Sequence, residues 1–495
     1  MVSRLYKGFD MQTLRNRIFK EVKRPTRMLS GITVVAVMTK PYPCPHGRCI
    51  YCPGGPEFGT PQSYIGNEPA LMRGIQTNFD PYEQVLLRLK QYEALNHIPS
   101  KVEVIIMGGT FTAMPMDYQE WFVTNIFEAF NRYPNPRPAT MPSLEEAHLR
   151  NETARIRVVG LTIETRPDWA KEKQIDFMLY LGATKVELGV QSIYDDVLYF
   201  ISRGHTVKDV VESTRLLKDA GYKVVYHIMP GLPGSDYDRD IAMIREIFEN
   251  PDYRPDMLKI YPVVVVEKTK LYELWKSGRY TALTDEEAIE LISEFYRYIP
   301  KWVRIMRIQR DIPAPLIVAG PRKANLRELV EERAIKKGMR INEIRFREVG
   351  RQILYRGKKL GSISITREYY EASGGMEVFL AVEDVNNNII IGLLRLRIPS
   401  EKAHRMEVDS RTALVREIHI YGPQVPIDMH VNDAWQHKGW GARLLKTAEE
   451  IARYEFNCNR IYILSGVGVR EYYRKLGYRR LDRTPYMFKE LGSHA

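Results

Sequence analysis

The chain has 495 residues, of which 44% are hydrophobic and 27% are charged. This length allows about two to four domains with full-sized cores, so the four cysteines are not needed as covalent staples. We find neither a signal peptide nor an apolar run near the ~18 residues that a membrane span requires. These features exclude a small disulfide scaffold and a membrane-spanning protein, and they predict a cytoplasmic protein with free thiols.

The net charge of +12 and the sequence pI near 9.2 indicate a polyanionic partner. Much of this charge lies before residue 30, where Arg17, Lys20 and Arg24 would share one face of a helix that ends before Pro25. We expect residues 1–30 to form a basic arm that contacts nucleic-acid phosphates. The alternative is an ordinary solvated face.

A buried-strand pattern at 31–38 begins a long alternation of strands and helices. The expected strands that follow are 102–107, 158–163, 185–189, 223–228, 258–262 and 303–308. The expected helices are 81–96, with Asp80 as its N-cap, 118–131, 168–181, 207–220, 236–249 and 285–298. Such alternation predicts an α/β fold, a partial or full TIM-like (β/α) barrel over residues 31–315, with its sites at the carboxyl ends of the strands.

Three of the four cysteines, Cys44, Cys49 and Cys52, fall within nine residues of the loop after the first strand. Three thiolates can bind three irons of a [4Fe–4S] cluster, which leaves the fourth iron open to S-adenosylmethionine. Reductive cleavage of that molecule yields a 5′-deoxyadenosyl radical, and Tyr51 before the last cysteine suits such a site. The alternatives are a Cys₃His zinc site completed by His46, and a disulfide. The four-residue gap after Cys44 is longer than the usual three, so the pattern alone leaves these alternatives open.

Glycine-bearing or polar segments follow four of the expected strands. They are MGGTF at 107–111, TIETRPD at 162–168, ELGVQS at 187–192 and HIMPGLPG at 227–234. Glycine lets a ligand approach the backbone closely. We therefore expect Gly108, Gly109, Glu164 and Gln191 to contact S-adenosylmethionine. Ordinary loop structure explains any one of these segments more readily than all four together.

Beyond about residue 315 the alternation stops. We assign residues 316–375 to a basic linker with an amphipathic helix at 321–338. From 376 to 495 strands dominate: 376–384 and 389–397 form a hairpin around Asn386-Asn387-Asn388, and strands at 414–421 and 460–465 follow. This pattern predicts a second, α+β domain.

The segment Gln436-His437-Lys438-Gly439-Trp440-Gly441-Ala442 opens a predicted helix that runs to about residue 454. A Q-x-x-G-x-G/A loop at a helix start can bind a pyrophosphate through backbone N–H groups, as in GNAT-like acetyltransferases. In that fold a tyrosine lies near the thioester sulfur, and Tyr472 and Tyr473 are the candidates. Amphipathic packing explains at least one of the pair. Cys458 is interpreted as a core residue.

Taken together, these motifs resemble the catalytic subunit of the Elongator complex and its stand-alone archaeal and bacterial homologues. The resemblance rests on the cysteine motif, on the strand-end motifs MGGTF, TIETRPD and ELGVQS, and on further segments spread over nearly the whole chain. They are RGHT at 203–206, LYELWKSGRY at 271–280, QRDIPAPL at 309–316, REIHIYG at 416–422, WQHKGWG at 435–441 and SGVGVREYYRKLGY at 465–478. The resemblance favours the iron–sulfur cluster over zinc.

The resemblance implies a radical-SAM domain followed by a GNAT-like domain, which together modify C5 of the wobble uridine in the tRNA anticodon stem-loop. By position, it implies that Cys44, Cys49 and Cys52 hold the cluster and that Lys101 and Tyr473 are catalytic. The implied acetyl-CoA contacts are Lys101, Glu417, Ile418, His419, Ile420, Gln436, Gly439, Trp440, Gly441, Ala442 and Tyr473. We further expect a protein that self-associates or works without accessory subunits.

The expected reaction starts when the adenosyl radical removes a hydrogen from the methyl group of acetyl-CoA. The carbon radical adds to C5 of a uridine that has left its stack, and oxidation and thioester hydrolysis leave a 5-carboxymethyl group. The rival interpretation is a protein lysine acetyltransferase with a structural iron–sulfur or zinc site. An RNA-binding scaffold without turnover is a third, and it leaves the glycine motifs unexplained.

Overall fold

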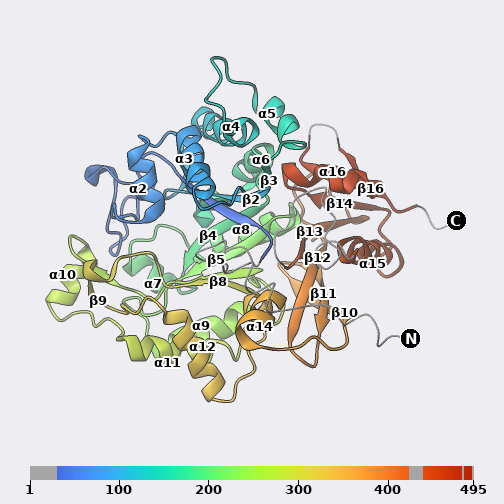
Figure 1. The fold of residues 1–495 in the computed structure, drawn as a ribbon. Coiled ribbons are helices and arrows are strands. Elements are labelled where there is room, and N and C mark those ends of the chain that lie inside the picture. The colour runs from blue at the N-terminus through green and yellow to red at the C-terminus, as the bar shows by residue number, and fades with distance from the viewer. Residues whose placement is uncertain (1–29, 423–438, 482–483, 493–495) are drawn as a thin grey trace.

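The structure, a computed structural model, describes residues 30–422, 439–481 and 484–492. It contains two seven-stranded sheets, one in the N-terminal two thirds of the chain and the other in the C-terminal third (Figure 1). The predicted basic arm lies outside the described residues except for Ser30. None of the described helices is both long enough and apolar enough to span a membrane.

The first sheet is parallel throughout, and its strand order follows the chain as β1-β2-β3-β4-β5-β6-β8. Its strands are β1 Thr33–Met38, β2 Lys101–Met107, β3 Arg157–Thr165, β4 Lys185–Gln191, β5 Lys223–Ile228, β6 Met257–Ile260 and β8 Arg304–Ile308. A separate two-stranded sheet pairs β7 Val265–Val266 with β9 Ile317–Ala319. Because β1 and β8 are the two outer strands, the barrel is open, which confirms the predicted partial (β/α) barrel.

Helices connect the parallel strands, as right-handed crossovers require. They are α2 Pro69–Gln76, α3 Pro81–Glu93, α4 Met116–Arg132, α5 Leu144–Asn151, α6 Glu172–Tyr180, α7 Asp195–Phe200, α8 Val207–Asp219, α9 Tyr237–Glu249, α10 Lys270–Lys276 and α11 Asp285–Phe295. Asp80 caps α3 as predicted, since its carboxylate accepts a hydrogen bond from the Glu83 N–H at 3.0 Å. The helix ends at Glu93, three residues earlier than expected, and Asn96 follows with a φ of +53°.

Three further helices lead out of the barrel: α12 Leu326–Lys336, α13 Ile344–Arg347 and α14 Val349–Arg356. The predicted helix at 321–338 is shorter than expected at its start. The N–H groups of Arg322 and Lys323 both donate to the Asp285 carboxylate, at 2.8 and 3.1 Å. These bonds hold the chain against α11 and delay the helix until Leu326.

The second sheet has the order β10-β11-β12-β13-β14-β16-β15. Its strands are β10 Ser364–Ala372, β11 Gly375–Asp384, β12 Ile389–Ile398, β13 Thr412–Ile420, β14 Arg460–Leu464, β15 Arg479–Arg480 and β16 Tyr486–Glu490. The predicted hairpin is present as β11 and β12, and β13 pairs with β14 in parallel. Two helices complete the domain, α15 Trp440–Tyr454 and α16 Arg470–Arg474.

The structure differs from the predicted boundaries at β10, which falls inside the segment assigned to the linker. This strand forms the edge of the second sheet and pairs with β11 over its full length. Of its nine side chains only Tyr370 and Ala372 are buried. An edge strand with so few apolar inward residues leaves little hydrophobic pattern in the sequence, which explains why it was missed.

The two domains share a buried network of charged side chains. Asp219 and Asp256 come from the barrel, whereas Glu377, Arg397 and Arg416 come from the second sheet. Arg416 donates to both oxygens of Asp256 at 2.7 Å and to Glu377 at 2.6 Å. Arg397 donates to Asp219 at 2.7 Å and to Glu377 at 2.9 Å. All five side chains are almost completely shielded from solvent, so this network fixes how the domains sit against each other.

Candidate active site

The three clustered cysteines lie in the loop after β1. Cys49 and Cys52 are buried, Cys44 is half-buried, and all three are free thiols. The Cys52 sulfur accepts a hydrogen bond from the Ser63 N–H at 3.1 Å. A methyl group on Gly109, after β2, would come within 3.8 Å of the Cys44 sulfur. The loop therefore lies over the carboxyl ends of the first strands, as the sequence predicts.

The spread of these thiols bears on the choice between zinc and a cluster. A tetrahedral zinc ion brings its sulfur ligands to within about 4 Å of one another, because each Zn–S bond is ~2.3 Å long. In the described part of the chain, only Glu164, Glu187 and His227 bring three ligand atoms within 4.8 Å of one another. His46 Nε2 does lie 3.2 Å from the Cys49 sulfur, but the cysteines stand further apart. A cube-shaped cluster, which holds its thiolate ligands further apart than a single zinc ion does, is compatible with this arrangement.

Two buried arginines border the cysteine loop. Arg203 Nη1 lies 3.7 Å from the Cys49 sulfur, and Arg166 forms an ion pair with Asp168 at 2.7 Å. Burial raises the pKa of the Cys44 thiol, while its bond with Thr110 and the nearby Arg203 guanidinium act in the opposite direction. Arg166 Nη1 is buried without a hydrogen-bond partner among the described residues. This positive surrounding favours a bound anionic group next to the thiols.

The strand ends beyond the cysteines carry the other predicted contacts. Gly109 has a φ of +97°, and a side chain on Gly108 would overlap Thr39 at 2.0 Å, so both positions require glycine. Gln191 has a φ of +68°, and its Oε1 is buried without a partner in the described structure. Gly109, Glu164 and Gln191 line the same cavity as Cys44. The structure therefore brings these sequence-predicted residues together.

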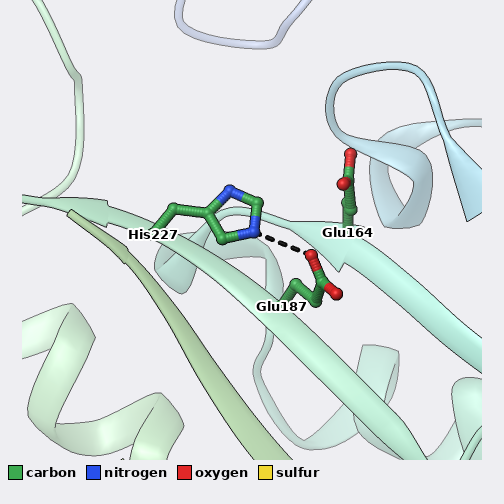
Figure 2. A group of neighbouring side chains, drawn as sticks. All are labelled: Glu164, Glu187 and His227. Carbon is green, nitrogen blue, oxygen red and sulfur yellow. Dashed lines mark hydrogen bonds and ion pairs between the residues drawn. The ribbon is translucent and has the colours of Figure 1, made fainter. Parts of the chain in front are cut away.

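Charged side chains from β3, β4, β5 and β6 line the cavity inside the barrel. Figure 2 shows Glu164 from β3, Glu187 from β4 and His227 from β5 on neighbouring strands, with Glu187 between the other two. His227 Nε2 lies 2.8 Å from the Glu187 Oε2, and Lys259 from β6 forms ion pairs with both glutamates. Burial raises the pKa of Glu187, but Lys259 and then His227 outweigh it and keep the pKa below its ordinary value. Glu187 is therefore ionised at neutral pH.

One cavity of about 1210 Å³ extends from the cysteine loop to the second domain. Its lining includes Cys44 and Tyr51 at the loop, Glu187 and His227 in the barrel, and Glu417 on β13. Both domains thus contribute walls to the same space.

The second-domain wall of this cavity is one end of β13. β14 pairs only with Thr412–Val415, so residues 416–420 extend beyond their parallel neighbour. Glu417 accepts a hydrogen bond from Arg395 at 2.7 Å, and His419 bonds to the Ser30 carbonyl at 2.8 Å. Ile418 also lines the cavity, whereas Ile420 packs against Gly392 in β12. The exposed backbone of this strand end is suited to pairing with an amide-bearing chain.

The predicted pyrophosphate loop is only partly described, because Gln436 lies outside the described residues. Gly439 caps α15 with a φ of +75°, and Trp440, Gly441 and Ala442 form its first turn. A methyl group on Gly441 would come within 2.6 Å of the Tyr472 hydroxyl. Glycine at this position therefore lets α16 approach the start of α15, whose free N–H groups can bind an anion.

The remaining predicted residues, Lys101 and Tyr473, come from opposite sides of the domain contact. Lys101 opens β2 beside Arg157, and burial lowers its pKa, with a further contribution from Arg157. Gly468, just before α16, packs so closely on Arg157 that a methyl group there would lie 2.5 Å from its Cβ. Tyr473 is buried, and its ring packs against Tyr472 at 5.3 Å and Tyr478 at 6.2 Å. Lys101 and Tyr473 therefore flank the contact between β3 and the segment before α16, at the end of the barrel away from the cysteines, and neither lines the cavity that Cys44 lines.

Family descriptions match both halves of the chain. The Radical SAM superfamily matches residues 40–247, the Radical_SAM C-terminal domain matches 255–336, and the Acetyltransferase (GNAT) family matches 354–478. The chain is 53% identical to the tRNA uridine(34) acetyltransferase of Methanocaldococcus jannaschii, over 95% of this chain and 86% of that protein. It is 47% identical to Elongator complex protein 3 of Schizosaccharomyces pombe, over 97% and 88%.

A solved structure agrees with these relatives. The archaeal Methanocaldococcus infernus Elp3 with an N-terminal deletion (1–46) superimposes with a TM-score of 0.81 at 48% identity, covering 93% of this chain and all of that one. The chain belongs to the Elongator complex protein 3 family. It joins a radical SAM half-barrel to a GNAT acetyltransferase domain, which confirms the predicted fold and the family resemblance.

Some cavity residues of this Elongator complex protein 3 homologue were missed in the sequence. Lys259 lies inside β6, where the sequence Met-Leu-Lys-Ile reads as a buried strand, and a lysine there was not singled out. Glu187, His227 and Arg203 stood within motifs but were not chosen as site residues. The available signal was a charged residue inside an otherwise apolar strand, since such a charge is rarely buried without a partner.

Proposed function

We propose that this protein modifies C5 of the wobble uridine of tRNA, with acetyl-CoA as the carbon source and a radical derived from S-adenosylmethionine as the initiator. The observation that carries this proposal is the single cavity that the cysteine loop and the coenzyme A-type strand β13 both line. A shared cavity suits one reaction in which an acyl group meets a radical.

The residues around the cysteine loop fit the expected cofactors. Cys44, Cys49 and Cys52 would hold a [4Fe–4S] cluster, because they are three free thiols on one loop of a chain that the Radical SAM superfamily matches over residues 40–247. Gly109, Glu164 and Gln191 would contact S-adenosylmethionine from the neighbouring strand ends. When bound, the two groups supply a carbon radical that removes a hydrogen atom from the acetyl methyl group.

Acetyl-CoA would enter from the GNAT side. The end of β13 beyond its pairing with β14 would offer backbone groups to the pantetheine amides, with Glu417, Ile418, His419 and Ile420 as the predicted contacts, and the first turn of α15 would offer N–H groups to the pyrophosphate. Tyr473 and Lys101 would contact the coenzyme A part of the molecule, at the barrel end away from the cysteines, because neither residue lines the cavity. The acyl end then extends along the cavity towards the cysteine loop.

The nucleic-acid partner is supported by positive charge on the cavity wall. Five arginines line one side of it. They are Arg304, Arg307, Arg310, Arg345 and Arg351. Guanidinium groups bind phosphates and stack on bases, so this side would hold the anticodon loop while the uridine turns inward. We infer a cytoplasmic enzyme that acts without accessory subunits or with a second copy of itself.

An anaerobic assay tests this function. Reconstituted protein receives tRNA, S-adenosylmethionine, a reductant and acetyl-CoA labelled in its methyl group. We expect label in a modified uridine, no labelled uridine with Cys49→Ala, and a normal amount with Cys458→Ala. Cys458 is the matched control, since it is also buried but lies in the GNAT domain.

The contradicting result is equally clear. If label appears only on protein lysines, and Cys49→Ala does not change it, the protein is a lysine acetyltransferase and the cysteine loop has a structural role.

A further inference from the structure

His227 is held in the geometry of a general base inside the shared cavity. Its Nε2 lies 2.8 Å from Glu187 Oε2, so the ionised carboxylate fixes the proton on that nitrogen. Its ring packs edge-on against Tyr261, with centroids 5.4 Å apart. No described group forms a hydrogen bond to Nδ1, and Figure 2 shows this nitrogen on the ring edge away from Glu187. The lone pair of Nδ1 is thus available to a molecule in the cavity.

A metal ion is the first alternative for this group, because Glu164, Glu187 and His227 bring three ligand atoms together. The ammonium group of Lys259 already supplies the positive charge that a metal ion would provide to these carboxylates. This ammonium group forms ion pairs with Glu187 and, at 3.4 Å, with Glu164. The two glutamates raise the pKa of Lys259 above its ordinary range even though burial lowers it, so the lysine stays charged. The group therefore needs no metal, and its remaining unpaired nitrogen is that of His227.

The position of His227 along β5 places it beside the expected path of the acyl chain. Lys223, at the start of β5, lies near Glu417 on the GNAT wall, and His227 follows four residues later on the same face, about 13 Å further along the strand. Under the proposed function, the acetyl methyl reacts near the cysteine loop. The thioester carbonyl is the next atom back towards the GNAT domain, which is the part of the cavity that His227 lines.

We propose that His227, oriented by Glu187, is the general base that activates water to hydrolyse the thioester after the new carbon–carbon bond has formed. This inference rests on the proposed function. Nδ1 accepts a proton from water as the water oxygen bonds to the carbonyl carbon. The C–S bond then breaks, that proton passes to the departing coenzyme A sulfur, and the acid left on the uridine releases its remaining proton to solvent to become the carboxylate. No electron is gained or lost in this step.

The test follows products of the anaerobic assay by mass spectrometry in His227→Ala. We expect carboxymethyluridine to form at least about 100-fold more slowly and tRNA carrying a coenzyme A thioester to accumulate. Added imidazole should restore hydrolysis, because the cavity has room for a small base. Formation of 5′-deoxyadenosine should stay at the wild-type rate. His404→Ala is the matched control, since that histidine is also 2.9 Å from a carboxylate, Asp176, but does not line the cavity.

Two results overturn the proposal. Carboxymethyluridine formed at the wild-type rate by His227→Ala would show that another group activates water. A parallel fall of 5′-deoxyadenosine and product would show that His227 serves the S-adenosylmethionine site instead. If His227→Ala does not fold, His227→Gln is measured in the same way. Failure of the proposed function is distinct, because the wild type would then form neither adduct nor product.

Discussion

Lys218 is a completely buried lysine in the network between the two domains. Its ammonium group lies 3.7 Å from Glu377 and 4.0 Å from Asp256, and it has no hydrogen-bond partner among the described residues. Burial lowers the pKa of Lys218 to about 8, although both carboxylates oppose this. At pH values between about 8 and 10.5 the unfolded chain therefore binds one more proton than the folded chain.

This difference fixes the sign of a pH effect. The Lys218 contribution to the free energy of unfolding should increase from pH 8 to pH 9.5, by on the order of 2 kcal/mol. Lys218→Met removes this contribution. Urea unfolding of both proteins across that range measures it: the stability of the wild type relative to the variant should rise with pH. A constant difference would contradict the shifted pKa.

Some of the buried polar residues could be predicted from the sequence, and others could not. Glu164 and Gln191 were predictable because parallel strands end at one edge, and the residues after them must meet there. Arg397 and Arg416 were not, because each pairs with an aspartate more than 150 positions away. In the sequence they look like solvent-facing members of alternating strands. Only the docked domains show that both are buried.

At the scale of single elements, the segment before α16 packs unusually tightly against β3. A methyl group on Gly466 would lie 2.1 Å from the Val159 carbonyl oxygen, which is backbone and cannot swing away. Gly466 has a φ of −59°, which any residue adopts, so the restriction comes from packing alone. The glycines of the sequence motif SGVGV are therefore explained by a close contact between the domains.

Gly466→Ala should consequently destabilise the protein by about 1–3 kcal/mol, because α16 and the strand must move apart. Thermal unfolding measures this loss. The control is Gly160→Ala in β3 itself, where the nearest atoms lie at 3.5 Å and an added methyl group fits. Equal melting temperatures for the two variants would contradict the tight contact.

The predicted linker, residues 316–375, was wrong at one element, because it contains the strand β10. The strands 376–384 and 389–397 were found because most of their side chains are apolar, and almost all of them are buried. β10 lies at the sheet edge with most side chains exposed, so its identity depends on pairing with β11 rather than on its own pattern. The order of the domains was predictable, but the start of the second one was not.

At the scale of the whole molecule, the buried ionic network makes the two domains one unit. Arg416→Met would leave Asp256 and Glu377 without a major partner in a site that water does not reach. We expect a loss of about 3–5 kcal/mol and a single unfolding transition for both domains in calorimetry. Arg460→Met is the control, because its partner Asp409 is half exposed and such surface pairs contribute about 1 kcal/mol or less.

Two separate transitions in the wild type would contradict this coupling. So would equal effects of Arg416→Met and Arg460→Met.

The same network has a consequence for the behaviour of the protein at high temperature. Hydration of ions becomes less favourable on heating, so the cost of keeping these charges away from water falls while hydrophobic contacts gain little more. The contact between the domains should therefore weaken less on warming than the helices around it. The two walls of the cavity, β13 in the GNAT domain and the cysteine loop in the barrel, would therefore stay aligned up to temperatures close to the melting temperature of the protein.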